Sequence, residues 1–236
     1  MPTAWFAACL LAFVALGCAS TDNLGPVERA KLIHENVSAG QETLVALQSQ
    51  FCSNNPDRDL EQTVRGMEKA RRSFEEAVKL GPESHKGRRY LGDCLQLMGF
   101  EYRFEHDKLL LRAQPKAAKG GRPEGKEANG SRGLSAADQA KLAQYEAKYK
   151  EYLQASNKEY RFYERFIHTR HYPDVGIFDT MRMNYELLED WANAIEVGRK
   201  FIAETQLQGP ALEQAEKILR QYEQKLLEQQ GDDPEL

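Results

Sequence analysis

Apolar residues recur at alternating steps of three and four along most of this chain, and this spacing constrains its fold more than any other feature. The first such run contains Ala30, Ile33, Val37, Gly40, Leu44, Leu47 and Phe51. This spacing places apolar side chains on one face of an α-helix. No segment of the sequence alternates apolar and polar residues for long enough to form a strand. The sequence therefore predicts an all-α protein.

Prolines, glycines and capping residues divide the chain into about seven helices. The expected helices begin at Pro26, after Asp57 or Asp59, after Pro82 and at Ser135, and then cover about 175–189, 191–206 and 210–229. Ser135 is followed three residues later by Asp138, which is a variant of the capping box.

The segment 113–134 interrupts this pattern, because its prolines and glycines exclude a helix. We expect a long flexible loop inserted into the helical domain. Seven Lys or Arg residues lie between 108 and 132, against two glutamates. This loop could hold lipid headgroups or an acidic partner, or it could be a solvated linker.

The N-terminus carries an uncharged apolar run from Ala4 to Leu16, followed by Gly17-Cys18 and a polar segment. The run is well short of the ~20 residues that span a bilayer. It resembles the signal peptide of bacterial lipoproteins. The resemblance implies a signal peptide at 1–17, a lipidated Cys18 and a short tether at 18–25. Because no Asp follows the cysteine, it also implies a periplasm-facing protein anchored in the outer membrane. An ordinary cleaved signal, giving a soluble periplasmic or secreted protein, and an uncleaved anchor remain alternatives.

Two stretches resemble the tetratricopeptide repeat, a helix–turn–helix unit with aromatic and small residues at fixed positions. The first contains Phe178, Met181, Tyr185, Ala194 and Phe201, with a turn at 189–191. The second contains Ala70, Phe74, Ala77, Pro82 and the pair Leu91-Gly92. The resemblance implies helical hairpins over 26–230, followed by a C-terminal tail at 231–236. An irregular helical bundle is the competing interpretation.

In tetratricopeptide proteins the first helix of each unit lines a concave groove that binds other proteins. The resemblance places seven side chains on this groove: Lys86, Arg89, Asp93, Gln96, Asp179, Met183 and Glu186. We expect that replacing Arg89 and Asp93 together weakens partner binding without unfolding the domain.

Residues that could carry chemistry are few. His168 and His171 have a spacing that could bind a metal, but Pro173 ends the helix there, and we expect no metal site. The charged group Glu105-His106-Asp107 gives no better support for catalysis. Cys52 and Cys94 could form one disulfide or remain thiols. No catalytic or cofactor-binding motif occurs, so we expect neither an enzyme nor a cofactor.

The sequence thus favours a lipid-anchored, non-enzymatic adaptor or scaffold for proteins of the bacterial cell envelope. A net charge of -4 gives no reason to expect nucleic acid. One alternative is a self-associating helical spacer of the envelope. Another is a sugar- or peptide-binding module that uses the tyrosines of the helix beginning at Ser135, including Tyr149 and Tyr160. We expect these tyrosines to lie in the core instead, because aromatics at helical spacing are typical of a buried face.

Overall fold

The computed structural model describes residues 24–113, 134–167 and 174–231 of the 236-residue chain, and within these ranges the protein is helical without strands. The seven α-helices are α2 (Pro26–Leu47), α3 (Leu60–Leu80), α4 (His85–Ala113), α5 (Ala136–Glu164), α6 (Gly176–Leu187), α7 (Trp191–Thr205) and α8 (Gly209–Gly231). A short 3-10 helix, η3 (Gln48–Gln50), follows α2. The predicted all-α class is confirmed, and each expected helix is present.

The capping residues predicted from the sequence begin their helices as expected. The Asp59 carboxylate accepts a hydrogen bond from the Gln62 N–H at 3.1 Å, and the Ser135 hydroxyl accepts one from the Asp138 N–H at 3.1 Å. Asp190 caps α7 in the same way. These side chains satisfy backbone donors that the first turn of a helix leaves unpaired.

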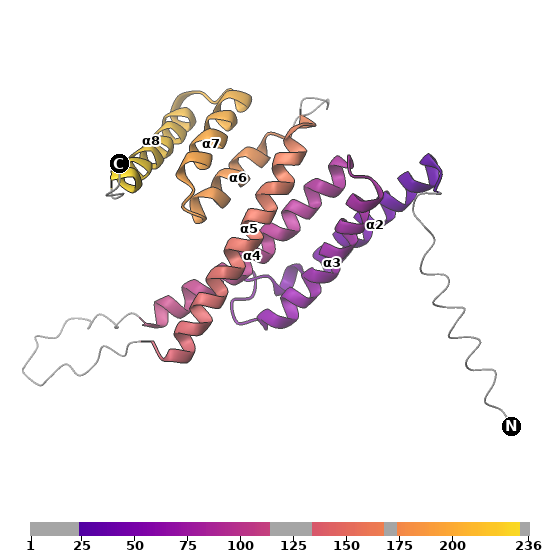
Figure 1. The fold of residues 1–236 in the computed structure, drawn as a ribbon, viewed down its shortest axis with the longest axis horizontal. Coiled ribbons are helices and arrows are strands. Elements are labelled where there is room, and N and C mark those ends of the chain that lie inside the picture. Colours follow the sequence, from indigo (N-terminus) through magenta and orange to yellow (C-terminus); the bar gives the residue numbers. More distant parts are fainter. Residues whose placement is uncertain (1–23, 114–133, 168–173, 232–236) are drawn as a thin grey trace, which may run out of the picture.

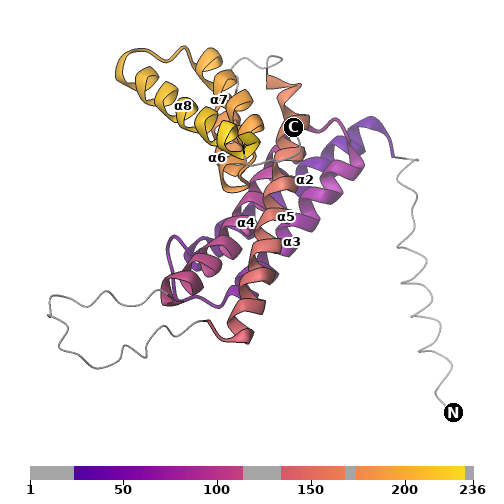
Figure 2. The same cartoon turned by 60° about the vertical axis from the view of Figure 1, so that its left-hand side comes forward.

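The helices form a succession of antiparallel hairpins: α2 with α3, α4 with α5, and α6 with α7, with α8 packed on α7. Figure 1 shows the helices following one another across the molecule from α2 to α8. The α4–α5 hairpin is the longest, and the end that holds Ala113 projects beyond the neighbouring helices (Figure 2). Of the described part of the chain, no helix is long and apolar enough to cross a membrane.

Glycines allow the helices of two hairpins to approach closely. A Cβ on Gly40 of α2 would lie 2.5 Å from a ring carbon of Phe74 on α3. A Cβ on Gly92 of α4 would lie 2.7 Å from the ring of Tyr160 on α5. Phe74 and Tyr160 are stiff aromatic side chains that are fully buried, so neither ring can move away from an added Cβ. Both positions therefore need glycine for packing. Gly40, which weakens helix propensity, thus lies at a packing contact.

Four of the five tyrosines of α5 lie in the core, and Tyr145 is partly buried. Tyr149, Tyr152, Tyr160 and Tyr163 are at most 8% exposed. Their hydroxyls have partners at the edge of the core, since Tyr160 donates to Asp93 at 2.6 Å and Tyr152 to Glu68 at 3.2 Å. Burial raises the pKa of Tyr160 to about 12. Because these rings are buried, a binding module that stacks ligands on Tyr149 or Tyr160 is excluded.

A polar cluster joins the second hairpin to the third. Asn184 of α6 is fully buried and donates to Asn157 at 2.9 Å and to Ser156 at 3.3 Å, both on α5. The Gln96 amide of α4 donates to the Asn184 oxygen at 2.9 Å. Within the described residues the Asn157 side-chain nitrogen has no hydrogen-bond partner. The paired groups still favour this arrangement of the helices, because another arrangement would leave more of them unpaired.

A buried ion pair fastens the connection between α2 and α3 to the middle of α4. The side chains of Arg58 and Glu101 are 1% and 2% exposed and are ion-paired with each other. Arg58 also bonds Glu105 at 3.0 Å, and the Cys52 N–H donates to Glu101 at 2.8 Å. This pair was not predicted from the sequence. Its only signal was a glutamate on the otherwise apolar face of α4.

Candidate functional site

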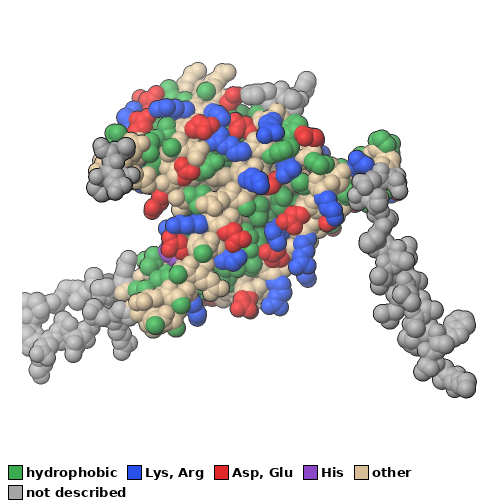
Figure 3. All heavy atoms as spheres, viewed as in Figure 1, with side chains coloured by type: hydrophobic (Ala, Val, Ile, Leu, Met, Phe, Trp, Pro, Cys, Tyr) green, Lys and Arg blue, Asp and Glu red, His purple; other side chains and the backbone are tan. Residues whose placement is uncertain are grey.

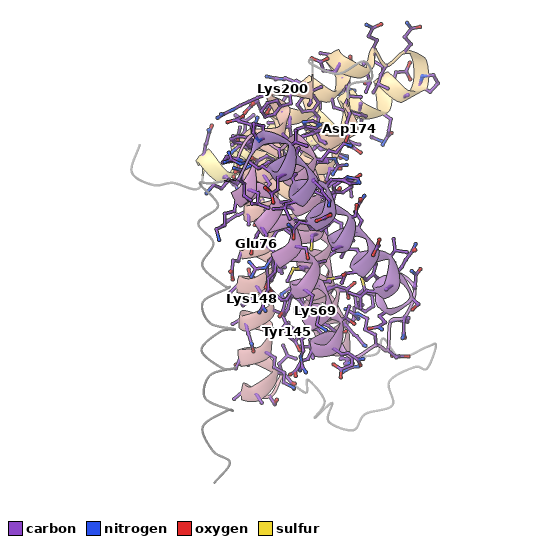
Figure 4. The ribbon with its side chains drawn as sticks, turned by 90° about the vertical axis from the view of Figure 1, so that its right-hand side faces the viewer. Lys69, Glu76, Tyr145, Lys148, Asp174 and Lys200 are labelled. Carbon is purple, nitrogen blue, oxygen red and sulfur yellow. The ribbon has the colours of Figure 1, made fainter. Side chains whose placement is uncertain are left out.

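Three of the four groove residues predicted on α4 lie together. Lys86, Arg89 and Asp93 line a depression of about 240 Å³, together with Tyr90, Tyr163 and Asp174. We call it the α4 depression. In Figure 4, Asp174 lies toward the end of the molecule that holds α6, α7 and α8. Tyr145 and Lys148, in the first half of α5, lie toward the opposite end. The fourth residue, Gln96, bonds the buried Asn184 instead of lining the depression.

Arg89 connects three elements within the α4 depression. Its guanidinium donates to the Asp174 carboxylate at 2.8 Å and to the Tyr160 hydroxyl at 3.3 Å, and it is ion-paired with Asp93. The guanidinium carbon also lies 5.2 Å from the centre of the Tyr160 ring. These contacts hold α4 to α5 and to the start of α6. Replacing Arg89 and Asp93 is therefore expected to cost stability, contrary to the expectation from repeat phase alone.

The groove residues predicted on α6 lie in a different place. Asp179 and Glu186 both accept hydrogen bonds from Arg182, at 2.8 and 3.3 Å. Arg182 in turn donates to the Tyr222 hydroxyl of α8 at 2.6 Å. Asp179 lines a depression of about 360 Å³ between α6, α7 and α8, which we call the α6–α8 depression. Met183 is 41% exposed and does not line it. The predicted residues of α4 and α6 therefore do not meet in one site.

The largest of these depressions was not predicted. It has a volume of about 430 Å³ and lies between the first half of α2 and the turn that joins α3 to α4. We call it the α2 groove. Its apolar lining includes Ile33, Val37, Leu80 and Pro82, and its rim includes Lys86. The α2 groove and the α4 depression therefore share Lys86. Sequence periodicity assigned these apolar residues to separate helix faces, and only the hairpin geometry brings them together.

The side chains of the charged group on α4 contact neighbouring side chains of the fold. The His106 ring lies edge-on against the Tyr149 ring, 5.6 Å between centres, and its Nδ1 lies 3.0 Å from an Asp107 carboxylate oxygen. Glu105 accepts a hydrogen bond from Arg58. Groups of three or more His, Cys, Asp or Glu side chains suited to a metal ion are absent from the described residues.

The two cysteines of the helical body are free thiols. Cys94 is buried, and burial raises its pKa to about 12. Cys52 is half-buried, and burial, followed by the charge of Glu101, raises its pKa to about 11. Because the thiolate is the reactive form, neither environment suits a nucleophile. Cys18, His168, His171 and most of the basic segment at 108–132 lie outside the described residues.

Comparison with known proteins gives no family for this chain. No protein-family model, no curated protein and no solved structure matches it. The resemblance to tetratricopeptide proteins therefore rests on the residues quoted above.

Proposed function

We propose that this chain is a lipid-anchored, non-enzymatic adaptor or scaffold that binds other proteins in the bacterial cell envelope. The observation that carries the proposal is the row of helical hairpins with three depressions on its surface. Helical hairpins stacked in a row contact only their neighbours and so present long surfaces to other proteins. On the face seen in Figure 3, Lys and Arg side chains alternate with Asp and Glu side chains across the helices.

Membrane attachment in this proposal depends on Cys18. A diacylglycerol with an additional amide-linked chain anchors a protein stably, whereas a single acyl chain does not. Helix α2 begins at Pro26, so the tether from Cys18 is short. The adaptor would therefore work close to the periplasmic face of the outer membrane.

A self-associating spacer is the second candidate. Exposed apolar side chains would favour it if they formed a continuous face. Leu111 near the end of α4 is 66% exposed, and Leu227 on α8 is 68% exposed. Isolated apolar residues are common on protein surfaces, whereas a spacer would need them joined into continuous faces.

The molecular mass of the detergent-extracted full chain separates these candidates. We expect a monomer by sedimentation with the detergent density-matched, because an adaptor keeps its depressions open for other proteins. A Leu111→Glu, Leu227→Glu variant serves as the control and should have the same mass. A dimer or larger assembly would contradict the adaptor and support the spacer, and its dissociation by this variant would assign the contact to Leu111 and Leu227.

A further inference from the structure

We propose, on the basis of the adaptor function above, that the α6–α8 depression binds a basic segment of the partner protein. A large apolar side chain of that segment would enter the depression. A Lys or Arg side chain near it would pair with the carboxylates of Asp179 and Glu186 on α6. The partner would therefore be recognised by an apolar residue and a cation that lie close together.

The α6–α8 depression has the size and lining to hold an apolar side chain. Its volume of about 360 Å³ lies within the ~300–1,000 Å³ that is typical of ligand pockets. Its apolar lining combines small residues with larger ones, namely Gly198, Ala211, Ala215, Phe201, Ile202 and Ile218. The small residues leave a space that the larger ones enclose, and an apolar side chain that fills this space is removed from water.

Close packing of α7 against α8 fixes one side of the depression. A Cβ on Gly198 would lie 2.6 Å from the Leu219 Cδ2 atom, so this leucine rests on the α7 backbone. Both residues line the depression, and Leu219 is buried. Because this side is already ordered, a bound segment does not have to pay for ordering it.

Two carboxylates on α6 each have an oxygen that can accept a cation. Arg182 bonds the other oxygen of each, Asp179 Oδ1 at 2.8 Å and Glu186 Oε2 at 3.3 Å. Among the described residues, no hydrogen bond or ion pair reaches Asp179 Oδ2 or Glu186 Oε1. The Asp179 and Glu186 side chains are 41% and 43% exposed, whereas that of Arg182 is 15% exposed. An incoming Lys or Arg therefore meets two accessible carboxylates and one largely covered arginine.

The charge of the surrounding helices also favours a basic partner. Residues 174–231, which form α6, α7 and α8 at one end of the molecule (Figure 1), contain eleven Asp or Glu and six Lys or Arg, a net charge of -5. Within the described part of the chain, the charged lining of the depression consists of Asp179 and Arg182, and Glu186 follows along α6. The local charge is therefore negative as well. Complementary charge orients a partner and accelerates its association.

A peptide fits the depression better than a lipid surface does. Anionic headgroups would be repelled by the net negative charge of residues 174–231. The apolar side chains also line a concave space, whereas a helix that lies on a bilayer buries a projecting apolar face. Short peptide segments commonly bind in grooves between helices, where a few anchoring side chains supply the specificity.

The test uses the detergent-extracted full chain and a phage-displayed library of random twelve-residue peptides. We expect enriched peptides to carry a large apolar residue with Lys or Arg within about four residues of it. Ala211→Phe, which narrows the depression, should weaken the best synthetic peptide at least about tenfold, equivalent to about 1.4 kcal/mol. The double variant Asp179→Asn, Glu186→Gln keeps the shape of both side chains but removes their charge, and should weaken the peptide at least about fivefold.

Salt dependence gives an independent measurement of the charge pairing. Added salt should raise the dissociation constant of the original chain more steeply than that of the double variant, because salt screens exposed ion pairs that the double variant no longer forms.

Two control variants match these changes elsewhere on the same helices. Ala203→Phe adds the same side chain at an exposed position of α7 that does not line the depression. The double variant Glu223→Gln, Glu228→Gln removes two carboxylate charges from α8, also outside the depression. Glu223 is 43% exposed and ion-paired with Arg199, much as Glu186 is with Arg182. Both controls should bind the peptide as the original chain does, and all variants should keep the helical circular dichroism spectrum.

Several results would overturn this site. They are a selection without enrichment, enrichment of acidic peptides, and binding that survives both Ala211→Phe and the double variant of Asp179 and Glu186. A concentration-dependent dimer that this double variant dissociates would assign the depression to a second copy of the chain instead.

Capture of envelope proteins with the same variants separates this site from the adaptor function. If Ala211→Phe and the double variant of Asp179 and Glu186 retain a partner that the Cys18→Ala variant loses, the adaptor function stands and the site is wrong. If the original chain captures no partner although it binds the selected peptide at the depression, the adaptor function itself fails.

Discussion

Replacing Arg58 with methionine is expected to lower the free energy of unfolding by about 3–5 kcal/mol, because it leaves the Glu101 carboxylate buried without its ion-pair partner. The side chains of both residues are almost completely buried. The Cys52 N–H would remain as a donor to Glu101, but it carries no full charge to balance the carboxylate. The measurement is urea unfolding followed by circular dichroism.

The matched control for this prediction is Arg71→Met on α3. Arg71 is ion-paired with Glu68 and Glu75, but its side chain is 31% exposed, so solvent screens the interaction. We expect a loss of no more than about 1 kcal/mol there. Equal losses in the two variants would contradict the assignment of Arg58 and Glu101 as the pair that holds the 51–59 connection.

Replacing Tyr160 with alanine is expected to cost about 3–5 kcal/mol, the range for removing a large aromatic side chain from a core. The Tyr160 ring is fully buried against Gly92, and its hydroxyl donates to Asp93. Its loss would open a cavity where α4 and α5 are closest. Urea unfolding of the full chain measures this effect as well.

Tyr160→Phe separates the ring from the hydroxyl. It keeps the packing against Gly92 and removes the two hydrogen bonds that join the hydroxyl to Asp93 and Arg89, so a loss of about 1–2 kcal/mol is expected. If the alanine variant were as stable as the phenylalanine variant, the ring would not be part of the core, and the tyrosines of α5 would again be candidates for ligand binding.

Much of the fold could be predicted from local signals. The spacing of apolar residues identified the helices, and Asp59, Ser135 and Asp190 marked three helix starts, because capping depends on residues only a few positions apart. Local signals also placed Tyr149 and Tyr160 of α5 in the core, since aromatic residues at helical spacing are typical of a buried face.

The candidate site could be predicted only in part, because it depends on contacts between distant segments. Lys86, Arg89 and Asp93, which repeat phase placed on one face of α4, line one depression, and their role in binding stays a prediction. Repeat phase could not show that Asp174 accepts a hydrogen bond from Arg89. Nor could it show that Arg182 bonds both Asp179 and the Tyr222 hydroxyl of α8. The α2 groove was missed for the same reason, since its walls come from α2 and from the turn after α3.

The most direct test of the proposed function is affinity capture of the membrane-extracted full chain from the cell envelope, analysed by mass spectrometry beside a Cys18→Ala control. The adaptor function predicts a defined envelope protein, recovered in a constant ratio to the chain and lost from the control, which lacks the lipid anchor. Recovery of the chain alone, as a multimer and regardless of Cys18, would contradict the adaptor and favour a structural spacer.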